Sequence, residues 1–334
     1  MKETRDRLTD FVAHGTEKCR VLVVGDVMLD QYYYGEVTRI SPEAPVPITR
    51  VIRTKETLGG AANVAHNLAL LGCHTEVAAS VGADHHGGRL RALFDKRGIS
   101  IYGLVVTGAP TTTKLRVIGG HQQMMRLDFE ETEPVVGESA ERIFAVAQAS
   151  LEGGAGTLVL SDYGKGIITP ELSARLIEAA HRRGIPVVVD PKGKDWKKYR
   201  GADYITPNLK ELNAVQSSLT KNEDAAVEKA ARHAMTRFGI RAMVATRSEC
   251  GLSLITEESA VHIRAKAQEV FDVSGAGDTV IATFALALAG GVPPEDGAYL
   301  ANLAASVVVA KVGTYAVNRE ELLSVLEREE RHES

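Results

Sequence analysis

The sequence has few cysteines and no long apolar run. Its three cysteines are odd in number and widely spaced, which fits neither a disulfide framework nor a zinc site. The charged first twenty residues lack the apolar core of a secretory signal. The most apolar stretches, IATFALALAGG and ANLAASVVVAKV, are too short or too interrupted to span a bilayer. We therefore expect a reduced, cytoplasmic protein with no membrane partner.

A block of like charges is also missing. The net charge is −4 and no basic cluster stands out, so the sequence gives no sign of nucleic-acid binding. With 334 residues, of which 44% are hydrophobic, the chain can bury about three quarters of its unfolded surface. The length suggests two domains or one large α/β domain with an insertion. Because no linker or repeat is visible, we expect residues 1–334 to form one domain.

Short apolar runs recur along the chain, each followed by a polar or glycine-rich turn and a helix-like segment. Strands buried on both faces and separated by helices indicate a mostly parallel sheet flanked by helices. Good helix candidates are GAANVAHNLALLG, GGRLRALFDKRG and TPELSARLIEAAHRRG. The predicted strands fall within residues 20–26, 75–84, 156–166, 185–193, 202–208 and 241–251.

Two stretches, approximately 31–57 and 107–130, break this rhythm with β-like alternation and no helix between strands. The second is predicted to be a hairpin turning at Gly119 and Gly120. Alternation places Lys114 and Arg116 on one face of the first strand, and Arg126 and Asp128 on one face of the return strand. The two stretches would form a small separate sheet, basic on one face and apolar on the other, that covers the crevice as a lid. Since exposed apolar sheet faces often pair, we expect a homodimer through this lid.

Polar residues follow the predicted strands, where open parallel sheets bind ligands. Asn208 and Glu211 stand three residues apart, and they fit either a helix capping box or a water-mediated hold on Mg²⁺ and nucleotide phosphates. The other polar candidates at these strand ends are Asp162, Lys165, Lys192, Thr246 and Arg247.

The stretch FDVSGAGDTV, residues 271–280, runs from a glycine-rich turn into a predicted helix. It lacks the Lys of a Walker A motif and the third glycine of a dinucleotide fingerprint. The backbone N–H groups of Gly275, Ala276 and Gly277 could hold a phosphoryl group during its transfer. Asp278, one residue further, could accept the proton of the attacking hydroxyl.

This stretch resembles the D-x-x-G-A-G-D signature of the ribokinase-like sugar kinases. The resemblance extends over nearly the whole chain, through GGAANVAHNLALLG, VGADHHGGRLRALFDKRGI, PNLKE and TRSECGLSL. It implies an ATP-dependent kinase in which Asn208 and Glu211 organise Mg²⁺ and phosphate. It further implies sugar contacts from Asp30, Gly59, Gly60 and Asn63, nucleotide contacts from Lys192, Thr246, Arg247, Gly251 and Asn302, and a monovalent cation, K⁺, near Asp272 and Ser274.

Within that family, GDVMLDQYYYG, RISPEAPVP, SDYGKG and TRSECG are most similar to the heptose-7-phosphate kinases of bacterial lipopolysaccharide core synthesis. The resemblance implies phosphorylation of D-glycero-β-D-manno-heptose 7-phosphate at the anomeric oxygen. No H-x-G-H motif of a fused nucleotidyltransferase occurs, so we expect the stand-alone kinase.

The basic residues agree with a phosphorylated sugar, since a phosphate dianion needs cations around it. Lys114, Arg116 and Arg126 of the lid and Lys165 and Lys192 of the crevice are the candidates. The alternative is that the lid residues are merely solvated. The rival functions are another kinase of the family acting on a different sugar phosphate or a nucleoside, a silent nucleotide-binding regulator, and a nicotinamide-dependent dehydrogenase.

Overall fold

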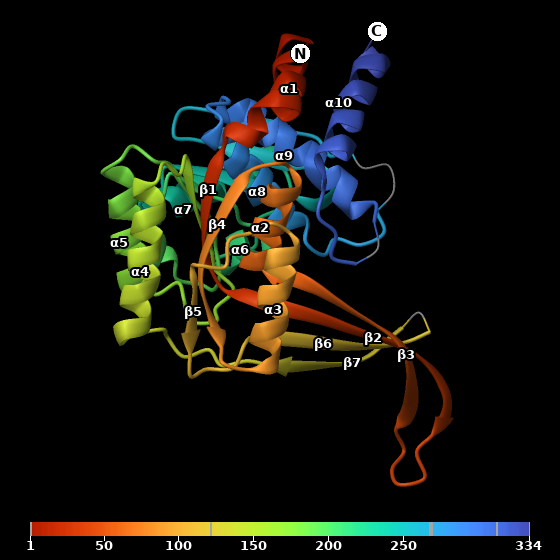
Figure 1. Cartoon of the computed structure of the whole chain (residues 1–334). Helices are drawn as coiled ribbons and strands as arrows, with labels where there is room; N and C mark the ends of the chain where they lie inside the picture. The colour runs from red at the N-terminus through yellow and green to blue at the C-terminus, as the bar shows by residue number, and fades with distance from the viewer. Residues whose placement is uncertain (1, 121, 267–269, 312, 334) are drawn as a thin grey trace.

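A computed structural model describes residues 2–120, 122–266, 270–311 and 313–333, and it contains a large sheet and a small one (Figure 1). The large sheet has the order β13-β12-β11-β10-β9-β8-β1-β4-β5. Its pairs are parallel except those of β12 with β11 and β13. The strands are β1 (Arg20–Gly25), β4 (His74–Gly82), β5 (Leu104–Thr107), β8 (Thr157–Ser161), β9 (Val187–Asp190), β10 (Tyr204–Ile205), β11 (Ala242–Thr246), β12 (Leu252–Ile255) and β13 (Ala260–Ile263).

Helices cover this sheet, as the recurrent strand and helix pattern predicts. Helix α4 packs against β1, β4 and β5, while α2 and α8 pack against each other and against β1, which is buried from Val21 onward. The α-helices are α1 (Lys2–Asp10), α2 (Ala61–Leu70), α3 (His85–Lys96), α4 (Gly137–Glu152), α5 (Pro170–His181), α6 (Leu209–Ala214), α7 (Asp224–Phe238), α8 (Ala276–Ala289), α9 (Pro294–Val309) and α10 (Arg319–Glu333). In the described part of the chain, no helix combines the length and apolarity needed to cross a membrane.

Local sequence explains where the predicted helices begin. The Thr169 side chain accepts a hydrogen bond from the Leu172 N–H at 3.2 Å, and Pro170 occupies the first position of α5. Such a cap satisfies one of the N–H groups that the first helical turn leaves unpaired. Asp84 caps α3 in the same way by accepting from the Gly87 N–H at 2.6 Å.

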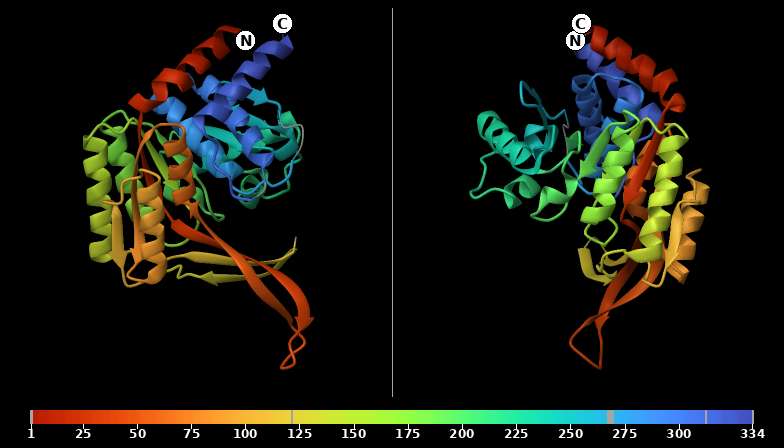
Figure 2. Two further views of the ribbon diagram at one scale, coloured as in Figure 1. Left: turned by 45° about the vertical axis from the view of Figure 1, so that its right-hand side comes forward. Right: turned by 90° about the vertical axis from the view of Figure 1, so that its left-hand side faces the viewer.

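The two aberrant stretches form the small sheet, in the order β3-β2-β6-β7. Its strands are β2 (Val27–Ile40), β3 (Pro47–Gly60), β6 (Thr113–Gly119) and β7 (Gln122–Phe129). The predicted hairpin of β6 and β7 is present, with His121 outside the described residues, and β2 joins β6 in parallel. Only Asp26 separates β1 from β2, so the chain passes directly from the large sheet into the small one. The far part of the β2–β3 hairpin projects away from the body (Figure 2).

The small sheet has two chemically different faces. On the first, Lys114 lies opposite Asp30 and Asp128, and Arg116 lies opposite Tyr32 and Arg126. This face was predicted to be basic, and its cations outnumber the two aspartates that share it. We call it the polar face; it comprises Asp30, Tyr32, Tyr34, Arg53, Lys55, Lys114, Arg116, Arg126 and Asp128. The apolar face comprises Tyr33, Leu115, Val117, Met125, Leu127 and Phe129.

Candidate active site

The strand-end residues meet in one pocket of about 210 Å³. Strands β8, β9, β10 and β11 are neighbours in the sheet, so the turns after them converge at one edge. The lining includes Asp162, Tyr163, Asp190, Lys192, Thr206, Asn208, Glu211, Thr246, Gly275, Gly277 and Asp278. The structure thus brings eight of the predicted site residues together, with Asp190, which also follows a predicted strand, and it adds Tyr163 to them.

Asp278 lies in the first turn of α8 and is buried. Its Oδ2 accepts a hydrogen bond from Asn63 Nδ2 at 2.7 Å, and its Oδ1 accepts one from the Tyr163 hydroxyl. Burial raises the pKa of Asp278 from 3.8 to about 6, with a smaller upward contribution from Asp30, while the two hydrogen bonds oppose the rise. A carboxyl group with a pKa near neutrality is suited to accept a proton and release it again.

The glycine turn before Asp278 has the geometry of a helix N-terminus that can face an anion. Gly275 is the N-cap of α8, and its φ of 83° is a left-handed conformation that favours glycine. A Cβ there would lie 3.1 Å from Asn63 Nδ2 and would crowd the partner of Asp278. The Ala276 N–H donates to the Val273 carbonyl at 3.2 Å, so this N–H of the predicted anion hole is engaged within the turn.

Asn208 and Glu211 form a complete capping box at the start of α6. Asn208 Oδ1 accepts from the Glu211 N–H at 2.9 Å, and Glu211 Oε2 accepts from the Asn208 N–H at 3.0 Å. The second Glu211 oxygen lies 3.6 Å from Lys192 Nζ. The capping interpretation is therefore confirmed, and the free edges of both side chains still line the pocket.

The pocket concentrates negative charge. Burial, with Glu211 and Asp278 nearby, raises the pKa of Asp190 well above its ordinary value. Four carboxyl groups and a single lysine line this pocket, an arrangement that suits a hydrated divalent cation. No group of three or more His, Cys, Asp or Glu side chains within the described residues is arranged to hold a metal directly. The donor set thus fits an ion held through water.

Asp162 reaches the same pocket, but its carboxylate also supports the loop that follows β8. It accepts hydrogen bonds from the Tyr199 hydroxyl at 2.5 Å and the Gly164 N–H at 2.7 Å, and it pairs with Lys198. Asp26 fastens the same loop from the other side. Its carboxylate accepts the N–H groups of Tyr163, Lys165 and Ile167 at 2.8 to 3.1 Å, which gives Asp26 a turn-forming role.

The residues predicted to hold a sugar lie beside Asp278. Asp30 is buried and pairs with Arg116 at 2.5 Å across the small sheet. Gly59 lies against Asp30, because a Cβ at this position would collide with Oδ2 of that carboxylate. Gly60, with a φ of 58°, leads into α2 and so places Asn63 on the pocket side of the helix.

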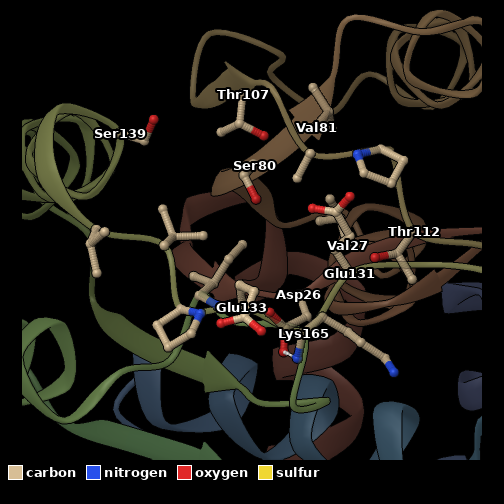
Figure 3. A pocket seen from close by; sticks show the side chains of 16 residues that line it. Asp26, Val27, Ser80, Val81, Thr107, Thr112, Glu131, Glu133, Ser139 and Lys165 are labelled. Carbon is tan, nitrogen blue, oxygen red and sulfur yellow. Dashed lines mark hydrogen bonds between the residues drawn. The ribbon is translucent and has the colours of Figure 1, made fainter.

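The predicted phosphate-binding cations lie at different distances from the pocket. Lys114, Arg116 and Arg126 are on the polar face, where Arg126 pairs with Asp128 at 2.8 Å. Lys165 pairs with Glu130 at 2.7 Å and borders a second cavity of about 180 Å³ (Figure 3). That cavity also carries Glu131 and Glu133, so its rim is acidic rather than basic.

On the nucleotide side, the side chain of one predicted residue is engaged within the fold. The Arg247 side chain is 1% exposed, and its guanidinium donates to Asn222 at 3.0 Å, Asp224 at 2.6 Å and Ser253 at 3.0 Å. These partners assign the guanidinium to the fold rather than to a nucleotide. Thr246 does line the pocket.

Two further nucleotide candidates and the cation candidates lie outside the pocket lining. The Asn302 side-chain amide donates to the Arg264 carbonyl at 2.9 Å, and Gly251 lies so close to Ile263 that a Cβ would collide with its carbonyl. The Asp272 carboxylate accepts from the N–H groups of Ser274 and Gly313, both at 2.9 Å. The nucleotide roles of Asn302 and Gly251 and the cation site remain predictions.

Comparison with known sequences places this geometry in context. The profile described as "pfkB family carbohydrate kinase" matches residues 18–321. "Bifunctional protein HldE" of Halorhodospira halophila is 47% identical over 313 residues, which are 93% of this chain and 64% of that protein. The protein of the same name from Trichlorobacter lovleyi is 44% identical over 96% of this chain and 65% of its own length. The chain thus spans slightly less than two thirds of these relatives.

Solved structures share the fold at lower identity. Phosphofructokinase-2 from Escherichia coli, solved in complex with potassium, matches with a TM-score of 0.76 and 20% identity over 93% of this chain and 99% of its own. Ribokinase from Arabidopsis thaliana, solved with ribose and ATP, matches with a TM-score of 0.72 and 21% identity over 92% and 99%.

Proposed function

The chain belongs to the pfkB family of carbohydrate kinases, and from this premise we propose that it phosphorylates D-glycero-β-D-manno-heptose 7-phosphate at the anomeric hydroxyl with ATP. The product would be the 1,7-bisphosphate, a precursor for the inner core of lipopolysaccharide. The heptose assignment rests on the sequence resemblance of SDYGKG, RISPEAPVP and their companion stretches.

The observation that carries the proposed chemistry is the environment of Asp278. Its carboxylate is held on both oxygens, at the N-terminus of α8 and in the pocket where the strand ends converge. In the proposed reaction the acceptor oxygen bonds to the γ-phosphorus of ATP, the bond from that phosphorus to ADP breaks, and the hydroxyl proton passes to Asp278. The N-terminal turn of α8, from Gly275 to Gly277, would face the transferred phosphoryl group.

Mg²⁺ would be held through water by Asn208 and Glu211, whose side chains face the acidic pocket. Bound there with ATP, it would offset the charge of the phosphates. This chain's own contribution is to fix both side chains through the capping box and to place Lys192 beside them.

The polar face of the small sheet supports a phosphorylated acceptor. Five cations stand there with two aspartates, and Arg53 and Arg116 already lie over the rings of Tyr34 and Tyr32. A dianionic phosphate would meet a net positive surface, and an arginine can bind it through two N–H groups. We propose Arg126, together with Lys114 or Arg116, as the phosphate-binding set.

The small sheet would act as the lid of a single kinase unit formed by residues 1–334. The Tyr32 hydroxyl already reaches Thr314 Oγ1 at 3.2 Å, so the polar face touches the body beside the pocket. On the opposite side, Met125, Leu127 and Phe129 are 42 to 55% exposed. A second copy of the chain would cover this apolar face and give a homodimer.

The first experiment is ADP release by the unmodified protein with a panel of acceptors. The panel includes heptose 7-phosphate, the same heptose without phosphate, fructose 6-phosphate, ribose and adenosine. Turnover confined to heptose 7-phosphate would establish the proposed function. Turnover on the unphosphorylated sugars would retain a kinase but remove the phosphate-binding role of the polar face. Absence of turnover on every acceptor would refute the proposal.

A further inference from the structure

Tyr163 is a residue that the proposed reaction does not yet use. It lies two residues after the end of β8 and lines the same pocket as Asp278. Its backbone is fixed, because its N–H donates to Asp26 Oδ2 at 2.8 Å and the same carboxylate accepts from Lys165 and Ile167. Asp26 is itself buried between the two sheets. These hydrogen bonds therefore fix the backbone from which the Tyr163 ring extends.

The Tyr163 hydroxyl donates to Oδ1 of Asp278, while Asn63 donates to Oδ2. Burial and the nearby Asp278 and Asp190 raise the pKa of Tyr163 well above its ordinary value, so its hydroxyl stays a donor at any assay pH. Hydrogen bonds to a charged group are among the strongest in proteins. Each donor stabilises the ionised carboxylate more than the protonated one.

The environment of Asp278 makes such hydrogen-bond donors necessary to keep its carboxylate ionised. Burial is the larger reason that the pKa of Asp278 is raised, and the Asp30 carboxylate on β2 adds to the rise. Lys192 is the lysine that lines this pocket, and it lies 3.6 Å from Glu211. Without hydrogen-bond donors, a carboxyl group buried beside Asp30 would retain its proton up to a higher pH and would be a poorer proton acceptor.

We propose that Tyr163 is a positioning residue of the kinase reaction proposed above, whose hydroxyl holds the Asp278 carboxylate ionised and oriented toward the acceptor hydroxyl. Tyr163 acts through Asp278 and exchanges no proton with the substrate. A phenylalanine at this position would keep the ring and remove only the donor. The inference depends on the proposed function for its kinetic consequence but not for the contact itself.

The kinetic test compares Tyr163→Phe with the unmodified enzyme between pH 5.5 and 9, using Mg²⁺-ATP and the best acceptor of the panel. Loss of one donor to a charged group is expected to move the acid limb of kcat upward by about one pH unit. Because the pKa of Asp278 is about 6, such a shift gives a roughly fivefold fall in kcat at pH 6, recovered near pH 9, with both KM values within about twofold. An unshifted acid limb, or the same fall in kcat at every pH, would overturn the proposal.

The matched control is Tyr199→Phe. Tyr199 is buried, and its hydroxyl donates to Asp162 at 2.5 Å in support of the same loop, but it does not contact Asp278. This variant is expected to lose stability while its acid limb stays in place. A shift of equal size in Tyr199→Phe would attribute the effect to the loop as a whole and overturn the assignment to Tyr163.

A second measurement needs no substrate. The unfolding equilibrium constants of Tyr163→Phe and the unmodified protein are compared by urea denaturation at pH 5 and at pH 8. The substitution should raise this constant by a factor that is roughly tenfold larger at pH 8, where Asp278 is charged, than at pH 5. The difference between the two pH values should vanish when Asp278→Asn is present in both proteins. If the panel shows no turnover, the proposed function fails, whereas only a pH-independent effect of Tyr163→Phe in this measurement would overturn the contact.

Discussion

Asp278→Asn should lower turnover and raise stability at the same time, because the group that the reaction needs is unfavourable to bury. The folded-state pKa of about 6 lies about two units above the value of 3.8 for an unperturbed carboxyl. Each unit corresponds to about 1.4 kcal/mol, so the buried carboxylate costs roughly 3 kcal/mol once it is fully ionised. The folded state binds the proton more tightly than the unfolded state, and stability is therefore lost as the pH rises from about 4 to about 6.

The neutral amide that Asp278→Asn introduces removes this cost but changes the hydrogen bonds. Its oxygen can accept a hydrogen bond from Asn63, but its amino group can only donate, so the Tyr163 hydroxyl must rotate and act as the acceptor. Allowing about 1 kcal/mol for this adjustment, we expect the variant to be more stable than the unmodified protein by about 2 kcal/mol at pH 8. The advantage should disappear near pH 4. Turnover should fall by about 10²- to 10⁴-fold because the proton acceptor is gone.

The assay is urea denaturation at pH 4.5 and pH 8, with ADP release measured on the same preparations. Asp203→Asn is the matched control: this carboxylate is also buried, but it accepts from the Val187 N–H at 2.9 Å and pairs with His181 and Arg241 at 3.0 Å. Its substitution should destabilise the protein at pH 8, the opposite sign. Equal stability of Asp278→Asn and the unmodified protein at both pH values would refute the electrostatic reasoning, and near-normal turnover would refute the proton-acceptor role.

Three further predictions follow from other contacts. Arg126→Ala should raise the KM for a phosphorylated acceptor about tenfold or more while the KM for ATP stays constant, because this exposed arginine can bind a phosphate and pairs with Asp128 of its own strand; steady-state kinetics at low salt would test it. Arg247→Met should lower stability in thermal unfolding without raising the KM for ATP, because it removes a buried guanidinium that donates to Asp224 and Ser253; a raised KM alone would return this side chain to the nucleotide site. Leu127→Glu places a charge on the exposed apolar face and should convert a homodimer to a monomer, which light scattering would measure while turnover per chain is assayed alongside. An unchanged mass would place any dimer interface elsewhere.

The sequence predicted the architecture well because its signals are local. Short apolar runs that end in polar turns marked β1, β4, β8, β9, β10 and β11, and Thr169 with Pro170 marked the start of α5, whereas β5 was not predicted as a strand of the large sheet. The alternation around Lys114 and Arg116 predicted which side chains share a face. It could not predict that β2 would bring Asp30 to that face, because pairing between segments more than eighty residues apart leaves no mark in either segment.

The site was predicted as a set of positions but not as a set of contacts. Asn208 and Glu211 were compatible with a cap and with a metal, and the structure shows that one geometry forms the cap while lining the pocket. Arg247 follows a strand as a ligand-binding residue would, yet the polar groups of Asn222 and Ser253 draw it inward. The sequence did not predict the role of Tyr163, because a tyrosine hydroxyl that supports a carboxylate has no sequence signature of its own.

The position of β1 in the sheet also has a consequence for synthesis of the chain. Val21 pairs with Thr75 on one side and with Thr157 on the other. At ribosomal rates of about 5 to 20 residues per second, roughly 7 to 27 seconds separate the emergence of Val21 from that of its second partner. During that interval one edge of the strand VLVV, which is fully buried in the finished protein, is open to pairing with other chains. Truncations that end before β8 should therefore aggregate rather than yield a soluble half, and slower translation should lengthen the period in which the nascent chain depends on chaperones.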